Sequence, residues 1–331
     1  MDSLLIIRLS ALGDVLHTIP AVLELRCAFP ATEISWAVEP PYAELVAEVT
    51  GVDRVIPVAS KRWRRNLRSA QTYREAASVR RALRAAAAGD CAVDFQGLIK
   101  SASLGWISGA RRRFGFDAGS IRERAALMFI NRPIDPGDAR HIIEINRGLA
   151  HRIIHAEGST PCMVVEPDFS DWAASGSTPA TRRAVREPFA VLLPGSGGKG
   201  KIWNIDRWKG LADIVAREHA LRPLVLWGPG EEGLAATIAA GGPAVRAPET
   251  DLRELAFVLS RAKIVIGGDT GPLHLAAALG TPVVGLYGPT DPARNGPWRQ
   301  QDRCVETFTK EKTMESITLE SVAGRIREVL P

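Results

Sequence analysis

An acidic, a hydroxyl and an imidazole side chain stand close together in the stretch 268–280, which begins Gly-Asp269-Thr270-Gly-Pro-Leu-His274 and ends in glycine. The apolar runs on either side are typical of buried parallel strands. Asp269 and Thr270 are helix-capping types, and glycine often ends a helix. The pattern therefore turns free N–H groups and polar side chains toward one point outside a strand's carboxyl end, where open α/β sheets bind ligands. A satisfied core histidine would explain His274 alone, but the whole string favours a ligand site.

A glycine-rich loop with two lysines forms a second candidate site. Its sequence, Gly195-Ser196-Gly197-Gly-Lys-Gly-Lys201, fits G-x-G-x-x-G and also fits the P-loop pattern as far as Lys201. Ile202 then replaces the Ser or Thr that would hold magnesium, so we do not expect an NTPase. Both motifs bring glycine backbone close to an anion beside a cation. We expect phosphate contact, with Ser196 donating and Lys201 neutralising a diphosphate; a flexible turn is the alternative.

Two further acidic residues stand near places where a strand pattern gives way to a helix pattern. Asp14 follows the tight turn at Gly13, where the positive end of a helix favours a carboxylate. Such a carboxylate suits a general base acting on a hydroxyl. A helix cap asks for the same residue, and His17 is a weaker candidate base. Glu231 follows the run 224–227 and could accept hydrogen bonds from sugar hydroxyls, or could belong to an acidic surface loop.

Basic residues outnumber acidic ones by 14 to 3 between Arg54 and Arg113. Such a field steers anionic partners, namely nucleic acid, anionic lipid head groups or a phosphorylated substrate. Low aromatic content and the lack of a nucleic-acid-binding motif argue against the first. The segment 61–68 carries five cations, which repel one another unless an anion binds there, and Lys100 and Arg122 could extend the patch. A solvated surface run is the alternative.

The elements that must position these residues alternate between strand and helix patterns. Strand patterns fall at 4–9, 33–38, 54–58, 91–95, 113–116, 189–194, 224–227, 263–267 and 281–287, and helix patterns at 15–28, 74–88, 208–218, 232–240, 252–261 and 316–330. This alternation predicts an α/β fold of two Rossmann-like doubly wound domains with a cleft between them. We predict an N-terminal domain at 1–168, a linker at 169–188, a C-terminal domain at 189–312 and a terminal helix within 313–331.

Composition indicates an ordinary soluble protein, with 46% hydrophobic and 24% charged residues among 331. We expect no signal peptide and no membrane span, because no apolar run is long enough. The four cysteines, Cys27, Cys91, Cys162 and Cys304, stand far apart, with neither metal-ligand spacing nor a disulfide framework. We therefore expect a reduced, cytoplasmic setting and no metal site.

Together these motifs resemble the bacterial lipopolysaccharide heptosyltransferases, most closely the type I members that act on the inner core. The matching strings are L-G-D-V-L-H-T-I-P at 12–20, V-I-P-V at 55–58, R-W-R-R at 62–65, D-F-Q-G-L-I-K-S-A at 94–102, K-I-W at 201–203, D-T-G-x-x-H at 269–274 and Y-G-P-T-D-P at 287–292. They keep their order over nearly the whole chain. The second-half loop departs from the type I pattern, which tends to carry threonines there.

The resemblance implies a GT-B fold with the acceptor site in the first domain, the nucleotide-sugar site in the second and a terminal helix that returns to the first. It also implies an inverting, metal-independent transfer of heptose from ADP-heptose to a Kdo hydroxyl of Kdo-lipid A, with Asp14 as general base and Lys201 stabilising the departing diphosphate. The implied donor site comprises Ser196, Gly197, Lys201, Glu231, Thr250, Asp269, Thr270, Gly271 and His274. The implied acceptor site comprises Lys61, Arg62, Arg64, Arg65, Lys100 and Arg122. Thr250 stands near the position where the family contacts the adenine, so the preference for one nucleobase stays open.

The resemblance also implies a monomer that needs no cofactor, binds no nucleic acid and acts peripherally at the cytoplasmic face of the inner membrane. Three alternatives stay open at this point. The first is heptosyltransferase II or a related transferase with another acceptor or donor sugar. The second is a nucleotide-binding oxidoreductase, suggested by G-x-G-x-x-G. The third is a non-catalytic protein that binds lipid or nucleic acid through the basic patch.

Overall fold

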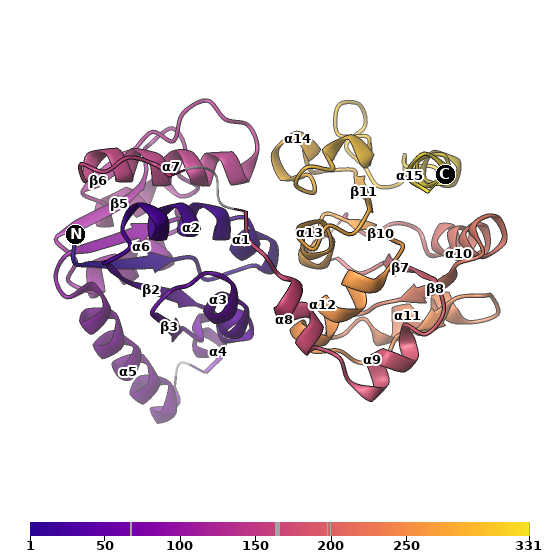
Figure 1. Cartoon of the computed structure of the whole chain (residues 1–331), viewed down its shortest axis with the longest axis horizontal. Coiled ribbons are helices and arrows are strands. Elements are labelled where there is room, and N and C mark those ends of the chain that lie inside the picture. Colours follow the sequence, from indigo (N-terminus) through magenta and orange to yellow (C-terminus); the bar gives the residue numbers. More distant parts are fainter. Residues whose placement is uncertain (67, 163–165, 197, 199, 331) are drawn as a thin grey trace. The chain divides into compact units, whose positions relative to one another are not determined.

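The computed structural model of the chain consists of two compact units, residues 1–167 and 168–331 (Figure 1). It describes residues 1–66, 68–162, 166–196, 198 and 200–330, so the predicted donor residue Gly197 lies outside the described residues. Each unit is built on a six-stranded sheet whose described strand pairs are all parallel. The prediction of two doubly wound α/β domains is confirmed.

The first sheet has the strand order β3-β2-β1-β4-β5-β6. Its strands are β1 (Ser3–Ile7), β2 (Glu33–Val38), β3 (Arg54–Pro57), β4 (Cys91–Asp94), β5 (Arg112–Phe116) and β6 (Arg132–Ile134). Leu4 of β1 lies opposite Ile34 on one side and Cys91 on the other, and every residue of β1 is buried. Burial on both faces explains why β1 reads as a continuous apolar run rather than an alternating one.

Seven α-helices and two short 3-10 helices are described in the first unit. They are α1 (Leu12–Leu16), α2 (Ile19–Ala28), η1 (Pro40–Tyr42), α3 (Ala43–Val49), α4 (Ser60–Arg65), α5 (Ala70–Ala87), α6 (Ile99–Ile107), η2 (Arg124–Phe129) and α7 (Ile142–Ala156). The prediction of one helix over 15–28 is wrong, because α1 ends at Leu16 and a new helix begins at Ile19. Pro20 stands in the first turn of α2, the position where a missing N–H costs least.

The second sheet has the order β12-β11-β10-β7-β8-β9, with β7 (Phe189–Leu193), β8 (Arg222–Val225), β9 (Val245–Arg246), β10 (Ile264–Gly268), β11 (Val283–Tyr287) and β12 (Cys304–Glu306). Its helices are α8 (Ser170–Ser175), α9 (Pro179–Ala184), α10 (Ile205–His219), α11 (Glu232–Ala239), α12 (Leu252–Arg261), α13 (Gly271–Ala278), α14 (Pro292–Asn295), η3 (Gln301–Arg303) and α15 (Leu319–Val329). Both sheets therefore reverse their strand order at the middle pair.

Two segments of the second unit have structure that the sequence pattern did not specify. Most of the predicted linker, 169–188, is helical, and its helices α8 and α9 pack on α12, with Trp172 buried. The terminal helix α15 buries Val322 and Ile326 in the core of the second unit, against α10, and Arg327 pairs with Glu218 at 2.9 Å. The family resemblance implies that this helix returns to the first domain, which remains a prediction. A low-complexity composition hid short helices that tertiary packing stabilises.

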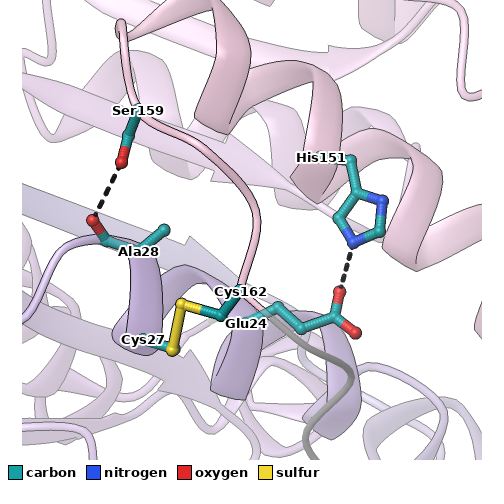
Figure 2. The surroundings of a disulfide bond; sticks show 6 residues. All are labelled: Glu24, Cys27, Ala28, His151, Ser159 and Cys162. Carbon is teal, nitrogen blue, oxygen red and sulfur yellow. Dashed lines mark hydrogen bonds and ion pairs between the residues drawn. A yellow bond between two sulfur atoms is a disulfide. The ribbon is translucent and has the colours of Figure 1, made fainter.

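A disulfide joins Cys27 at the end of α2 to Cys162 beyond α7, although the two residues are 135 positions apart (Figure 2). The expectation that the cysteines form no disulfide is therefore wrong, and the inference of a reduced setting loses its support. Tertiary packing explains the pairing, because α2 lies against α7. Two further contacts in Figure 2 hold the same elements together: His151 lies 2.8 Å from Glu24, and the Ser159 hydroxyl donates to the Ala28 carbonyl at 3.2 Å.

No described helix combines the length and the apolar composition that crossing a membrane would require.

We predict that the oxidised protein, denatured without reductant, exposes two reactive thiols, and four after reduction. The two are Cys91 and Cys304, which are buried, and burial raises the pKa of each to about 12, so both should react poorly in the native state. Thiol titration and mass spectrometry of unreduced peptides would check this. Four thiols in the unreduced, denatured chain would contradict the Cys27–Cys162 bond.

Candidate active site

The first candidate site lies at the carboxyl ends of β1 and β4, where the strand order of the first sheet reverses. Open α/β sheets bind ligands at such a point because the connections that follow the two neighbouring strands run in opposite directions and leave a crevice between them. β1 leads into Arg8 and the first turn of α1, which carries Asp14. Arg8 Nη2 lies 2.6 Å from Asp14 Oδ1, and Arg122 Nη2 lies 3.1 Å from the same oxygen. One carboxylate thus lies between two guanidinium groups.

The charges around Asp14 decide its protonation state. Burial raises the pKa of its carboxyl group, but the guanidinium groups of Arg8 and Arg122 outweigh burial and hold that pKa below its usual value. The Ala11 N–H adds a long hydrogen bond of 3.4 Å to Asp14 Oδ2, so the side chain also caps its helix. The sequence predicted a carboxylate held by the helix end; the arginines are the stronger cause. The interpretation of Asp14 as a helix cap is therefore compatible with its interpretation as a general base.

Arg8 is a site residue that sequence reasoning missed. Its side chain is 1% exposed, and its Nη1 donates to the Phe95 carbonyl at the end of β4. The Trp36 indole donates to the Arg8 carbonyl at 3.1 Å, which fixes the backbone there. An arginine directly after a wholly apolar strand was the available signal, because a guanidinium there must be buried and so needs a carboxylate.

The loop after β4 holds Arg122 in place. The buried Asp94 carboxylate accepts from the Gln96 N–H at 2.9 Å and the Gly97 N–H at 3.2 Å, and burial raises the pKa of Asp94 to about 6. Gly97 has a positive φ of 68°, and its carbonyl accepts from the Glu123 N–H at 3.0 Å. A Cβ at Gly97 would lie 3.2 Å from the backbone nitrogen of Arg122. This glycine therefore sets the position of the arginine beside Asp14.

The predicted acceptor residues of α4 are exposed and lie near one another. The buried Glu39 carboxylate anchors the start of α4, accepting from the Ser60 hydroxyl at 2.5 Å and the Lys61 N–H at 3.2 Å. Burial lowers the pKa of Lys100, and the charges of Arg64 and Lys61 also lower it, while the carboxylates of Glu39 and Glu123 oppose that shift. Lys100 therefore lies near both cations and carboxylates.

The other predicted residues of the first unit have separate surroundings. Arg62 pairs with Glu75, whose carboxylate also accepts from the Trp63 indole at 2.9 Å, and Arg65 is exposed at the end of α4. Arg122 pairs with Asp14. His17 is buried, edge-on to His141 with ring centroids 6.0 Å apart, so it belongs to the packing beneath α1.

The second candidate site lies at the carboxyl ends of β7 and β10, where the strand order of the other sheet reverses. β7 leads into the glycine-rich loop and Lys201, and β10 leads into Asp269. The Lys201 ammonium donates to Asp269 Oδ2 at 3.0 Å, and His274 Nε2 lies 3.1 Å from Asp269 Oδ1. The predicted residues Lys201, Asp269 and His274 are therefore brought together, although 68 residues separate the lysine from the aspartate.

A free helix end completes this second group. Burial raises the pKa of Asp269, but the hydrogen bond and charge of His274 and the charge of Lys201 outweigh it and lower that pKa. Thr270 precedes α13 in an extended conformation, and its buried hydroxyl has no hydrogen-bond partner among the described residues. The first N–H groups of α13, beginning at Gly271, have no partner within the helix. A cation, a hydroxyl and helix N–H groups in one place are suited to an anion.

Glu231 is fixed against the glycine-rich loop. Its Oε2 accepts from the Gly228 N–H at 2.9 Å, and a Cβ on Gly195 would lie only 2.0 Å from the same oxygen. The carboxylate therefore rests directly on the Gly195 backbone, which explains one glycine of the loop. The Ser196 hydroxyl accepts from the Gly198 N–H at 3.4 Å. Thr250 lies in the loop before α12, next to the capping residue Asp251.

The described residues include no group of three or more His, Cys, Asp or Glu side chains that could hold a metal ion.

Comparison with known proteins decides the family. The sequence pattern of glycosyltransferase family 9 (heptosyltransferase) matches residues 76–322. The chain is 35% identical over 326 residues to lipopolysaccharide heptosyltransferase 1 of Salmonella typhimurium, covering 97% of this chain and 99% of the relative. It is 33% identical over 294 residues to the Pseudomonas aeruginosa protein of the same name, covering 88% and 80%.

The chain belongs to glycosyltransferase family 9, the heptosyltransferases. It is therefore a glycosyltransferase, and the oxidoreductase and non-catalytic alternatives are wrong. Among solved structures it resembles Escherichia coli heptosyltransferase WaaC with ADP, at a TM-score of 0.83 and 31% identity over 98% of this chain and 99% of that one. The same enzyme with ADP-2-deoxy-2-fluoro heptose gives a TM-score of 0.79. The predicted GT-B fold is confirmed.

We predict that Gly97→Ala lowers the turnover of this heptosyltransferase about tenfold, because the new Cβ pushes the Arg122 backbone away from Asp14. The matched control is Gly109→Ala, since Gly109 has a similar φ of 79° but open space around its Cβ position. Both variants should lose about 1 kcal/mol of stability from the left-handed backbone. Steady-state kinetics and thermal melts would separate the two effects, and equal turnover in both variants would contradict the role given to Gly97.

Proposed function

We propose that the chain transfers heptose from ADP-heptose to a Kdo hydroxyl of the lipopolysaccharide inner core, with inversion and without a metal. The relatives named above are lipopolysaccharide heptosyltransferases 1, and the WaaC structures carry ADP or an ADP-heptose analogue. The observation that carries the proposal is the Asp14 carboxylate, kept ionised by Arg8 and Arg122 at the edge of the first sheet.

In the first step Asp14 acts as the general base. Its carboxylate accepts the proton of the acceptor hydroxyl while that oxygen attacks the anomeric carbon of the heptose. The bond from the anomeric carbon to the diphosphate oxygen breaks on the opposite face, so the configuration inverts and ADP leaves. Arg8 stays paired because its side chain is buried, whereas Arg122, 42% exposed, can exchange Asp14 for an acceptor anion.

The leaving diphosphate needs compensating charge, which the second unit supplies. Lys201 pairs with Asp269, but its side chain is 29% exposed and can turn toward a phosphate. The Thr270 hydroxyl and the N–H groups at the start of α13 are fixed donors for the same oxygens. Fixed donors and a cation can stabilise a departing anion in place of a metal. In the proposal, Asp269 then holds heptose hydroxyls, Glu231 holds ribose or sugar hydroxyls, and His274 reaches the donor phosphate.

The cations of α4 provide the acceptor site in this proposal. The charges of Arg64 and Lys61 disfavour the charged form of Lys100, so a carboxylate or phosphate bound beside these cations would be favourable. Kdo carboxylates and lipid A phosphates have this chemistry. The proposal includes Arg62 and Arg65 on the same helix, a monomeric enzyme, and action at the cytoplasmic face of the inner membrane.

The purified protein, incubated in EDTA with ADP-heptose and Kdo-lipid A, should release ADP and add one heptosyl group to the acceptor, as read by mass spectrometry. Transfer that appears only when a divalent cation is restored would overturn the metal-independent mechanism. Transfer only to an acceptor that already carries heptose would favour the heptosyltransferase II alternative.

We predict that Asp14→Ala lowers kcat by about 10²–10⁴-fold, because proton removal from the acceptor hydroxyl loses its base. Acceptor affinity should stay within a few-fold of the parent. Asp14→Asn keeps a polar partner for Arg8 and should fold more stably than the alanine variant while remaining as inactive. Asp171→Ala, an exposed acid on α8, is the control and should retain parental activity. Near-parental turnover of Asp14→Asn would overturn the assignment of the base.

We predict that Arg8→Met moves the acid limb of the kcat/KM profile to higher pH. Arg8 holds the pKa of Asp14 below its usual value, so removing the cation raises that pKa, and the base becomes protonated at a higher pH than in the parent. Arg8→Lys keeps the charge and should stay closer to the parental profile. The pH dependence of kcat/KM at constant ionic strength measures the shift; an unmoved acid limb in folded Arg8→Met protein would contradict it.

A further inference from the structure

An open groove of about 860 Å³ lies between α5 and α6 in the first unit, away from the residues assigned above except where it meets α4. Its apolar lining includes the side chains of Trp63, Val79, Leu83, Leu104, Trp106 and Ile107. Helices α5 and α6 pack on each other and on the first sheet, and Arg84 Nε reaches the Ile107 carbonyl at 3.4 Å. The groove is thus a formed feature of the fold.

Large exposed apolar side chains lie on the groove rim and on the elements next to it. Trp106 on the groove rim is 60% exposed, and its ring lies 6.2 Å from that of Phe129 in η2, which packs against α6. The neighbouring Met128 is 75% exposed. On α5, Tyr73 is 66% exposed and stands one turn before the groove residue Ala77. Soluble surfaces rarely gather such side chains unless something covers them.

The charged residues that line the groove all have one sign. Every lining residue that carries a charge is an arginine, namely Arg80, Arg81 and Arg84, each exposed on α5. Arginine side chains can lie along apolar material while the guanidinium stays at a polar boundary. A surface that is apolar at its centre and cationic at its rim matches a layer of acyl chains beneath anionic phosphates.

We propose that the face formed by α5, α6 and η2 docks on an anionic lipid bilayer, with Trp106 and Met128 entering the interface and the α5 arginines meeting phosphates. Indole and thioether side chains suit this boundary, since each pairs a large apolar surface with some polarity or adaptability. A protein partner of this chemistry would need an acidic rim, and the protruding side chains would need matching pockets.

The proposal rests on the proposed function, in which the acceptor is a lipid, and it specifies how the enzyme reaches that lipid. Trp63 lines the groove and stands between Arg62 and Arg64 on α4. Lys100 and Trp106 are six residues apart on α6, about 9 Å along the helix. Docking through this face therefore places α4, which carries Trp63 and the acceptor cations beside it, next to the lipid head groups.

Vesicle sedimentation tests the proposal with the full-length protein. The parent should bind phosphatidylcholine vesicles that contain phosphatidylglycerol and bind pure phosphatidylcholine vesicles much more weakly. Trp106→Ser and Met128→Ser should each weaken binding about tenfold, because apolar burial is lost. Arg80→Gln and Arg84→Gln should each weaken it about fivefold. Val245→Ser and Arg183→Gln, exposed on the second unit, are the matched controls and should bind like the parent.

Parental binding by the Trp106→Ser, Met128→Ser double variant would overturn the proposal, as would failure of the parent to bind anionic vesicles. Lipid-free sedimentation that shows the parent dimeric and this double variant monomeric would also overturn it, since the face would then join two copies. Transfer to a deacylated, water-soluble acceptor separates this proposal from the proposed function. The double variant should keep parental turnover in that assay, whereas a parent that binds vesicles but transfers nothing would contradict only the enzymatic assignment.

Discussion

The ion pair between Arg8 and Asp14 constrains the structure of the first unit. A guanidinium buried at the end of a strand costs several kcal/mol unless charge and hydrogen bonds compensate it. Asp14 supplies the charge, and the Phe95 carbonyl supplies a hydrogen bond from the end of the adjacent strand. The ends of β1 and β4 and the start of α1 are therefore held together by one side chain. In the proposed mechanism this fixed carboxylate is the general base.

The second unit repeats the arrangement with one difference. Asp269 also follows a central strand at the point where the strand order reverses, and it also pairs with a cation. Arg8 is 1% exposed, whereas Lys201 is 29% exposed. In the proposed mechanism the buried pair holds the base in position, and the more exposed pair keeps a cation available for a phosphate. The same sheet topology supports both pairs, because each reversal of strand order leaves a crevice at the carboxyl ends of the two central strands.

The chemistry-bearing strings predicted much of the candidate site. Lys201, Asp269 and His274 were predicted to act together, and the structure brings them within hydrogen-bond distance. Asp14 was predicted to be ionised, but its strongest partner, Arg8, was missed, because a one-dimensional pattern cannot show which strand ends are neighbours. The disulfide was missed for the same reason, since packing of α2 on α7, rather than any spacing, brings its two sulfur atoms together.

The sequence by itself determined the fold class, the positions of nine of the twelve described strands and the residue types at their ends; the short strands β6, β9 and β12 were missed. Apolar periodicity and turn residues are local signals, and the family strings keep their order along the chain. Only the tertiary structure decided which of those residues pair, that 169–188 forms helices on α12, and that α15 completes the second core. Charge pairing, sulfur pairing and the burial of short helices depend on contacts between segments distant in the sequence, which local patterns do not specify.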